Sequence, residues 1–337
     1  MLARAAAVSG LLGVYRRRPG RDVILLYHRV LTSPDELVDY SPIGISVSLA
    51  AFERQMAYLA RHYDVVPLAT LAATAAAGSG HGGKPRCAIT FDDGWLDNLT
   101  AAWPVLQRHA FPATIFLATN LMEGGAWFWE ERIMAYTAHC HQLLLRGGVP
   151  ADALRAHVRD DLLLAVMSGP AATLPAAIAT YVGGLRKDPV RRDAATATLD
   201  AAVRLPGCEP GRWFMTWDEV RGLANKGMDF GGHTASHVAL SGCPLEQAAD
   251  EIRRSSEALT SHLGRRERSF AYPYGKFTPA VARAVADAGF ARACTTRRGP
   301  VAVDSQPFDL PRIDVYEDVA LSLPMFGCRI TQFFGLF

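Results

Sequence analysis

The sequence lacks the features that mark several common classes of protein. Its 35 lysines and arginines are offset by 33 acidic residues, for a formal net charge of +2. It therefore has no basic excess of the kind that dedicated nucleic-acid binders show, and we expect no nucleic-acid partner. The 29 glycines and 20 prolines are spread along the chain, which excludes a coiled coil or a fibre. These absences leave a globular protein, and 337 residues are enough to bury a sizeable core.

Cysteine is also scarce. Six cysteines occur in 337 residues and none forms a C-x-x-C pair, which argues against a zinc ribbon, a thioredoxin-type motif and a disulfide scaffold. Buried free thiols are typical of a reducing compartment. We therefore expect a cytoplasmic protein.

The N-terminal segment, residues 1–21, combines an apolar run with basic residues. The run Ala5–Val14 is too short to span a bilayer, which needs about 20 apolar residues. Only Arg4 precedes the run and Arg16–Arg18 follow it, which is the wrong order for a cleaved signal peptide. One interpretation is a short amphipathic helix that rests on an anionic membrane, which would give the protein peripheral contact with the inner membrane.

From residue 22 to residue 337, short apolar runs alternate with helical patterns, which predicts a parallel sheet. Several of the runs end in polar, chemically capable residues, as the strands of a β/α barrel do. Strand signals vanish from about 120 to 212, where alanine, leucine and arginine dominate. The sequence therefore predicts an α/β barrel over 22–337, interrupted by an inserted helical segment.

Two adjacent carboxylates, Asp92 and Asp93, follow the apolar strand predicted at Cys87–Phe91, and Gly94 allows a sharp turn after them. Like charges this close repel each other, so either one carboxyl is protonated or a cation neutralises one. The alternative is an ordinary helix N-cap or turn, where Asp is common.

A second group, His233-Thr234-Ala235-Ser236-His237, follows another predicted strand. Two imidazoles four residues apart lie on one face of a helical turn and can bind one divalent metal, although two ordinary surface histidines remain the alternative. With a strand-end Asp they form a two-His, one-carboxylate set that suits hydrolysis. Such ligands favour zinc.

A third group, Phe270-Ala271-Tyr272-Pro273-Tyr274-Gly275, places aromatic residues and Pro at a strand end. A rigid wall of this kind can expose a backbone amide that stabilises an oxyanion. A simple strand-to-helix turn is the alternative.

In this order and spacing, TFDDG at 90–94 and HTASH at 233–237 resemble the motifs of the polysaccharide deacetylases, the NodB-like carbohydrate esterases. The resemblance covers roughly residues 22–120 and 213–315. It implies a distorted (β/α)7-type barrel and metal-dependent removal of acetyl groups from sugars. It also implies that Asp92 is the general base and that Asp93, His233 and His237 bind the metal.

The sequence departs from that family in two places. Tyr272 stands where the family has an Arg that braces the base, and no histidine follows His262 to supply the late acid. Instead His28 follows the first strand, which resembles the permuted branch that includes poly-N-acetylglucosamine deacetylases. We expect His28 to be the general acid, since His titrates near neutral pH and no other His that is not a proposed ligand follows a buried strand. A structural histidine is the alternative.

Two further roles complete the expected site. Arg312 could replace the missing brace, with a surface salt bridge as the alternative, and the Tyr274 amide could hold the oxyanion. The sequence thus predicts hydrolytic deacetylation of an N-acetylated sugar in a glycan or a lipid-linked glycan precursor, with zinc as the expected divalent metal. Hydrolysis of a non-sugar amide at the same site, or a pseudoenzyme that binds glycans, are the alternatives.

Overall fold

The computed structural model describes residues 22–32, 45–76, 83–123, 129–147, 152, 155–156, 158–170, 173–202, 204, 212–302, 304–320 and 322–332. The N-terminal segment 1–21, with its predicted membrane contact, lies outside these residues. The chain divides into two compact units. The first comprises Met1–Val30, Val47–Ala126 and Trp213–Phe337, and the second comprises Leu31–Ser46 and Trp127–Arg212.

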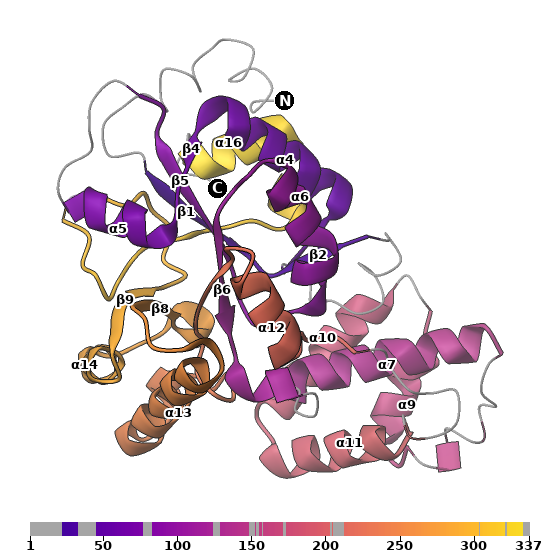
Figure 1. The fold of residues 1–337 in the computed structure, drawn as a ribbon. Coiled ribbons are helices and arrows are strands. Elements are labelled where there is room, and N and C mark those ends of the chain that lie inside the picture. The colour runs from indigo at the N-terminus through magenta and orange to yellow at the C-terminus, as the bar shows by residue number, and fades with distance from the viewer. Residues whose placement is uncertain are drawn as a thin grey trace. The chain divides into compact units, whose positions relative to one another are not determined.

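The first unit is built on a parallel sheet of eight strands (Figure 1). In chain order they are β1 (Val23–Tyr27), β4 (Asp64–Val65), β5 (Arg86–Phe91), β6 (Ala113–Leu117), β7 (Asp229–Gly232), β8 (Arg268–Ala271), β9 (Phe290–Cys294) and β10 (Ile313–Asp314). Seven of them lie side by side in the order β10-β1-β5-β6-β7-β8-β9, and β4 pairs with β5. β2 (Arg29–Leu31) and β3 (Ser46–Ser48) form a separate two-stranded sheet.

The segment that contains β10 joins the two edges of the sheet. Ile313 pairs with Leu25 of β1, while Leu310, three residues earlier, forms a parallel bridge with Cys294 of β9. The Leu310 carbonyl also accepts a hydrogen bond from the Thr295 N–H at 2.9 Å. The sheet therefore curls into a distorted barrel, which confirms the fold class expected from the sequence.

The central strands are apolar because the sheet is covered on both faces. Every residue of β1 and β6 is buried, as in parallel sheets whose crossover connections are helices. The helices of this unit lie around the outside of the sheet (Figure 1). They are α4 (Leu49–His62), α5 (Leu68–Ala76), α6 (Trp103–Arg108), α12 (Trp217–Ala224), α13 (Leu245–Leu263), α14 (Pro279–Asp287), α15 (Glu317–Ala320) and α16 (Leu323–Thr331).

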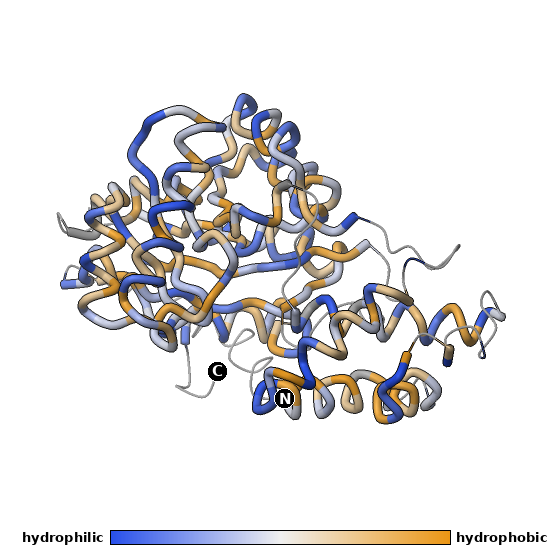
Figure 2. Tube along the Cα trace, turned by 90° about the horizontal axis from the view of Figure 1, so that it is seen from below, coloured by the Kyte–Doolittle hydropathy of each residue, from blue (hydrophilic) through white to orange (hydrophobic). Residues whose placement is uncertain are grey.

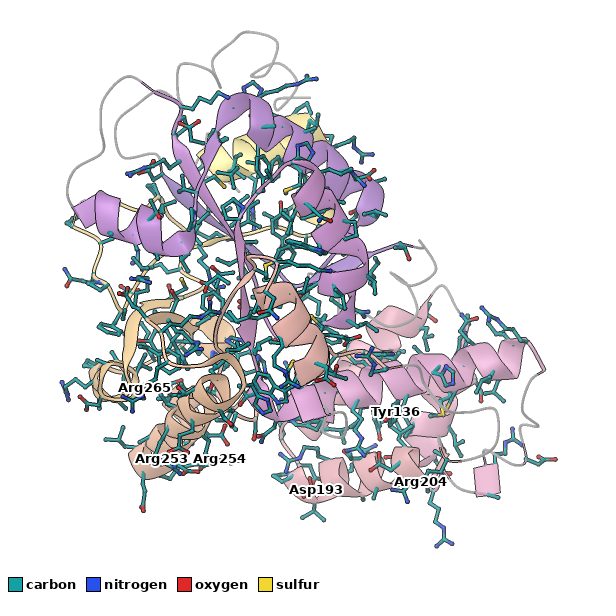
Figure 3. All side chains as sticks on the ribbon, viewed as in Figure 1. Tyr136, Asp193, Arg204, Arg253, Arg254 and Arg265 are labelled. Atoms are coloured by element: carbon teal, nitrogen blue, oxygen red, sulfur yellow. The ribbon has the colours of Figure 1, made fainter. Side chains whose placement is uncertain are left out.

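Local sequence signals define the helix ends. The Ser48 hydroxyl accepts a hydrogen bond from the Ala51 N–H and begins α4. Thr216 and Glu219 form a complete capping box at the start of α12. On the outer surface of α13, arginines such as Arg253 and Arg254 extend from the ribbon (Figure 3). Short turns of other helix types complete the unit: η1 (Asn98–Ala102), η2 (Thr119–Glu123), η4 (Leu240–Gly242) and η5 (Pro273–Gly275).

The second unit is helical where it is described. Its helices are α7 (Trp129–Leu145), α9 (Asp161–Met167), α10 (Leu174–Leu185) and α11 (Pro189–Ala202). Figure 2 shows hydrophobic and hydrophilic residues alternating along these helices, as expected when one face of each is buried. Leu163, Leu185 and Leu199 are fully buried and form part of the core of this unit. Within the described ranges, no helix has the length and apolar character needed to cross a membrane.

Candidate active site

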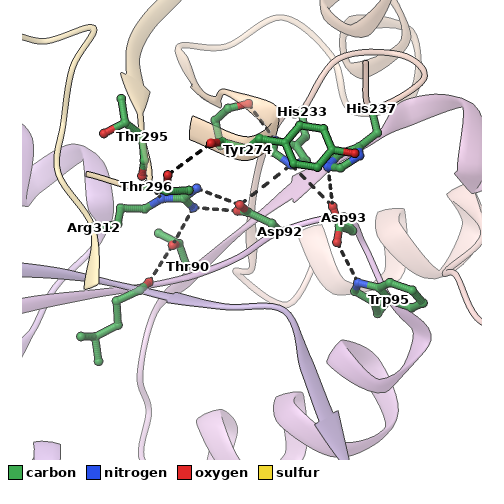
Figure 4. Close-up of polar contacts among 12 residues, drawn as sticks. Thr90, Asp92, Asp93, Trp95, His233, His237, Tyr274, Thr295, Thr296 and Arg312 are labelled. Carbon is green, nitrogen blue, oxygen red and sulfur yellow. Dashed lines mark hydrogen bonds and ion pairs between the residues drawn. The ribbon is translucent and has the colours of Figure 1, made fainter. Parts of the chain in front are cut away.

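Polar side chains gather at the carboxyl ends of the barrel strands, where such sheets bind ligands. His28 follows β1, and Asp92 and Asp93 follow β5. His233 follows β7, and Tyr274 lies in η5, directly after β8. Arg312 directly precedes β10, in the segment that joins the two edges of the sheet. Figure 4 shows five of these six residues in one site, all except His28, together with His237.

Asp93, His233 and His237 form a compact group of potential metal ligands. One oxygen or nitrogen atom from each lies within 4.8 Å of the others. Asp93 Oδ1 is 3.5 Å from the Nε2 atom of His233 and 3.5 Å from that of His237 (Figure 4). In the part of the chain that the structure describes, this is the one group of three such residues with that geometry.

The protonation of these histidines shows that the group suits a cation. His233 Nδ1 lies 2.7 Å from the Ala271 carbonyl, which can only accept, so Nδ1 carries the proton. Burial lowers the pKa of His233 below its ordinary value and lowers the pKa of His237 well below it, so both rings are neutral at neutral pH. The Nε2 atom of His233 is then a lone-pair acceptor facing Asp93 Oδ1, another acceptor. A divalent cation between them would turn this repulsion into coordination, and the Nδ1–H bond to a carbonyl is typical of metal-ligating histidines.

The loop that carries the two histidines is not helical, so the predicted helical turn is wrong. Thr234 and His237 both have positive φ angles, 64° and 56°. The loop is held instead by contacts with η2, since the Thr119 N–H donates to the Thr234 carbonyl and the Asn120 N–H donates to that of Ala235. Sparsely populated backbone conformations of this kind persist only where the surroundings impose them. In this loop the two imidazole rings lie side by side, with their centroids 4.9 Å apart.

The turn after β5 is equally constrained. Asp93 has a φ of 78° and Gly94 a φ of 87°. A Cβ atom on Gly94 would lie 2.8 Å from Leu117 and 2.9 Å from Met122. Gly94 is therefore required both by its backbone conformation and by close packing, and this turn directs Asp93 toward the histidines.

Asp92 forms a buried, bidentate ion pair with Arg312. The Nη1–Oδ1 distance is 2.6 Å and the Nη2–Oδ2 distance is 2.7 Å, and both side chains are almost fully buried. Arg312 is fixed in turn because it donates to the Thr295 carbonyl at 2.9 Å and to the Thr90 hydroxyl at 3.2 Å. Burial alone would raise the pKa of Asp92, but the Arg312 charge and the hydrogen bonds from Arg312 lower it to about 2. Asp92 is therefore ionised and fixed in orientation.

His28 is half-buried at the end of β1, and its carbonyl accepts a hydrogen bond from Asn98 Nδ2 at 2.7 Å. Burial is the main reason that the pKa of His28 is lowered to about 4, and the Asp92 charge opposes this shift. The Arg312 charge lowers it further. These influences place His28 in the electrostatic environment of the site. The near-neutral ionisation expected from the sequence is displaced to acid pH by burial.

The two tyrosines of the third motif have different environments. Tyr272 is buried, and its hydroxyl donates to the Phe308 carbonyl at 3.1 Å. Tyr274 is 48 % exposed, and its ring centroid lies 5.0 Å from that of His237. Tyr274 has a φ of 58°, and the Thr296 hydroxyl donates to its carbonyl at 3.3 Å. The strained turn thus positions Tyr274 beside the potential metal ligands.

Sequence reasoning missed several residues that contact this site. The Trp95 indole N–H donates to Asp93 Oδ2 at 3.0 Å (Figure 4). Arg29 lies 4.6 Å from the Trp95 ring centroid and forms an ion pair with Asp97. Glu251 of α13 accepts a hydrogen bond from the Ser236 N–H in the histidine loop. The contacts of Arg29 and Glu251 join separate elements of the fold, so no spacing rule signals them, and the contact of Trp95 with Asp93 depends on the backbone of the turn between them.

Comparison with known proteins agrees with this architecture. The family model described as polysaccharide deacetylase matches residues 79–147 and 193–293, half of the chain. No curated protein sequence matches the chain.

Solved structures share the fold at low sequence identity. The structure of IcaB from Ammonifex degensii is 20% identical with a TM-score of 0.57, covering 94% of this chain and 98% of that one. The Streptococcus pyogenes deacetylase PplD, in complex with acetate, is 16% identical with a TM-score of 0.56, covering 90% and 95%. The putative polysaccharide deacetylase BA0330 from Bacillus anthracis is 16% identical with a TM-score of 0.54, covering 92% and 68%.

Proposed function

The chain belongs to the polysaccharide deacetylase family, and from this premise we propose that it hydrolyses the N-acetyl group of a sugar residue with the help of one divalent metal ion. The substrate is an N-acetylated sugar in a glycan or in a lipid-linked glycan precursor. Zinc is the proposed metal, because two neutral imidazoles and one carboxylate form a ligand set that suits it. Nickel or cobalt could replace it in vitro, since such ligands do not discriminate strongly.

Asp93, His233 and His237 would hold the metal. A divalent ion bound there supplies a Lewis acid that polarises the acetyl carbonyl and acidifies water. The protein's own contribution is to fix the three ligands in advance: the Ala271 carbonyl orients His233, and the strained turn at Asp93 and Gly94 directs the carboxylate.

Asp92 is the proposed general base, which accepts a proton from the attacking water. Arg312 contacts both oxygens of Asp92 and so keeps the carboxylate in one orientation. The same contact lowers the pKa of Asp92 to about 2, which makes it a weak base. Asp92 would therefore hold the proton only briefly before passing it on.

His28 is the proposed general acid. Because burial lowers its pKa to about 4, the ring is neutral in the resting site and must receive its proton during turnover. The proton removed from water is the available source. As the carbon–nitrogen bond breaks, His28 would give this proton to the leaving amine, and the Tyr274 amide would donate a hydrogen bond to the oxyanion.

One observation carries this proposal: the Asp93, His233 and His237 group lies next to the buried Asp92–Arg312 pair. The distance from His233 Nε2 to Asp92 Oδ2 is 3.9 Å. A cation site beside an ionised, orientationally fixed carboxylate is the arrangement that metal-assisted hydrolysis requires.

Acetate release from N-acetylated chito-oligosaccharides tests the proposal. We expect activity that a chelator abolishes and that added zinc restores, and we expect His237→Ala to lose both activity and metal. Release from simple acetylated amides but not from the sugars would favour the non-sugar alternative. Binding of oligosaccharides without any acetate release from a panel of acetylated glycans would indicate a pseudoenzyme and contradict the proposal.

We also propose a cytoplasmic location with peripheral contact to the inner membrane. The basis is Arg16–Arg18 beside the apolar run, since each basic residue contributes about 1 kcal/mol of attraction to anionic lipid. Vesicles of anionic phosphatidylglycerol should bind the full chain in a salt-sensitive way, and Arg16→Gln/Arg17→Gln/Arg18→Gln should bind roughly 100-fold more weakly. Equal binding of both proteins would contradict the membrane contact, and recovery of an N-terminally processed protein outside the inner membrane would contradict the location.

A further inference from the structure

The second oxygen of Asp93 has its own partner. Asp93 Oδ1 faces the two imidazoles, while Oδ2 accepts a hydrogen bond from the Trp95 indole N–H at 3.0 Å. Trp95 is fully buried. The terminal torsion of an Asp side chain is broad, so a carboxylate without such a donor could rotate away from its ligand geometry. The buried indole N–H thus helps to hold Oδ2 on the side away from the potential metal site.

Trp95 is itself fixed by its neighbours. Its ring stacks on that of Phe214 with centroids 4.5 Å apart and an angle of 29° between the planes. The Arg29 guanidinium lies over the ring, 4.6 Å from the centroid, a geometry typical of a cation–π contact. The backbone on either side is also held, because the Met215 N–H donates to the Gly94 carbonyl and the Leu96 N–H donates to the Trp213 carbonyl.

Arg29 connects this indole to the segment that carries His28. Asp97 accepts hydrogen bonds from Arg29 Nε and from the Val30 N–H, both at 2.9 Å. The neighbouring Asn98 donates to the His28 carbonyl at 2.7 Å. A continuous set of contacts therefore runs from Asp93 through Trp95 and Arg29 to the backbone at His28.

We propose that Trp95 is a positioning residue, which sets the orientation of the metal ligand Asp93 through its indole N–H, and that Arg29 acts through Trp95 by fixing the ring. This inference rests on the proposed function, since it concerns how the metal site is prepared. Outer contacts of this kind are worth about 10- to 100-fold in metal affinity. A merely structural tryptophan would change stability without changing zinc affinity.

Trp95→Phe removes the donor and keeps an aromatic ring. Trp217→Phe is the matched control, because Trp217, at the start of α12, is also buried but stacks on His262 of α13. With zinc affinity measured by chelator competition, we expect Trp95→Phe to bind about 10- to 100-fold more weakly and Trp217→Phe to stay within about twofold of the wild type. Thermal unfolding of the zinc-free proteins separates this effect from loss of packing. Unchanged zinc affinity in Trp95→Phe would overturn the proposal.

A cycle of variants tests the part assigned to Arg29. Arg29→Met should weaken zinc binding in the wild-type background and have no further effect in the Trp95→Phe background, because the donor through which it acts is gone. Additive effects of the two substitutions would overturn the role of Arg29.

A metal-independent readout distinguishes failure of this proposal from failure of the proposed function. In zinc-free protein, the indole N–H resonance of Trp95 should be protected from exchange, and Asp93→Ala should shift it and remove the protection. An unchanged resonance would overturn the contact even if the protein binds zinc. Absence of zinc binding by the wild type would overturn the proposed function and the ligand-positioning role together, whatever the resonance shows.

Discussion

Each of the two units contains a bidentate arginine–carboxylate ion pair, and the two pairs have different surroundings. In the barrel, Arg312 contacts both oxygens of Asp92, and the exposed fractions of the two side chains are 0% and 3%. In the helical unit, Arg186 contacts both oxygens of Glu130 at 2.9 and 2.6 Å, but its side chain is 59% exposed. Both pairs are bidentate, although Arg312 uses its two Nη atoms and Arg186 uses Nε and Nη2, so the largest difference between them is the burial of the arginine.

The difference shows what a buried ion pair is for. Water screens the Glu130–Arg186 attraction, and exposed pairs contribute about 0–1 kcal/mol. Desolvating Asp92 and Arg312 costs several kcal/mol per ion, so the buried pair is weak evidence for added stability. Its effect is to fix one charge state and one orientation of Asp92 at the end of β5, which an exposed pair could not do.

The largest loss of turnover should come from substituting Asp92, the acidic member of the buried pair, or its neighbour Asp93. Asp92→Asn should retain zinc and lose about 10²–10⁴-fold in turnover, the usual contribution of a general base. Asp93→Asn should lose zinc as well as turnover. Metal analysis and acetate release on both variants measure this, and the reverse pattern of metal loss would exchange the two roles.

Replacing the arginine of each pair tests whether burial decides how much stability is lost when the pair is broken. Arg312→Met leaves the Asp92 carboxylate buried without its partner and should lower the free energy of unfolding by about 3–5 kcal/mol. Arg186→Met, the matched control, should lower it by less than about 1 kcal/mol. Urea unfolding at neutral pH gives both values, and equal losses would show that burial is not the deciding variable.

His28→Gln should lower turnover about 100-fold while zinc binding is retained. Between pH 6.5 and 4 the unfolded chain binds a proton at this position that the folded site excludes, because burial lowers the pKa of His28 to about 4. The wild type should therefore lose stability as the pH falls through this range, and zinc-free His28→Gln should lose less.

The pH dependence of kcat/KM checks the same assignment in the active protein. Because His28 enters the reaction neutral, its titration should not reduce kcat/KM between pH 6 and 8. The wild type and His28→Gln should therefore have pH profiles of the same shape in this range. A loss of activity in this range that disappears in His28→Gln would mean that His28 carries its proton into the reaction and that its pKa in the loaded site is near neutral.

The smallest effect concerns the turn next to Tyr274. Gly275 has a φ of 69°, and a Cβ atom there would lie 2.1 Å from the Thr296 hydroxyl oxygen. Gly275→Ala should cost about 1–3 kcal/mol through backbone strain and displacement of Thr296. Gly289 has a φ of 88° with open space around it, so Gly289→Ala isolates the backbone part. Equal unfolding midpoints for the two variants would show that contact with Thr296 adds nothing to the cost of Gly275→Ala.

The sequence predicted the parts of the fold and site that depend on local pattern. The apolar strands and the positions of Asp92, Asp93 and His233 directly after them follow from hydrophobic periodicity. The family assignment and the distorted barrel are confirmed.

The sequence could not predict features that depend on backbone strain or on contacts across the sheet. The positive φ angles of Thr234 and His237 follow from the η2 contacts, so the local spacing suggested a helical turn that does not form. The pKa of His28 depends on burial of its ring, and the residues next to it in the sequence do not indicate how deeply the ring is buried. The contact of Trp95 with Asp93 could not be predicted, because the direction of the indole N–H depends on the turn at Asp93 and Gly94.

The segment Leu310–Asp314 also has a consequence for how the molecule folds. Arg312 and Asp92 are 220 residues apart in the chain, and the same segment supplies the contacts that join β9 to β1. Contacts between such distant residues form late, because the loop-closure entropy must be overcome before they add any stability. During synthesis, β1 and β9 would remain unpaired on these sides until the segment emerges, and Asp92 would lack its arginine until that time. Barrel closure and completion of the site are therefore a single, late folding event.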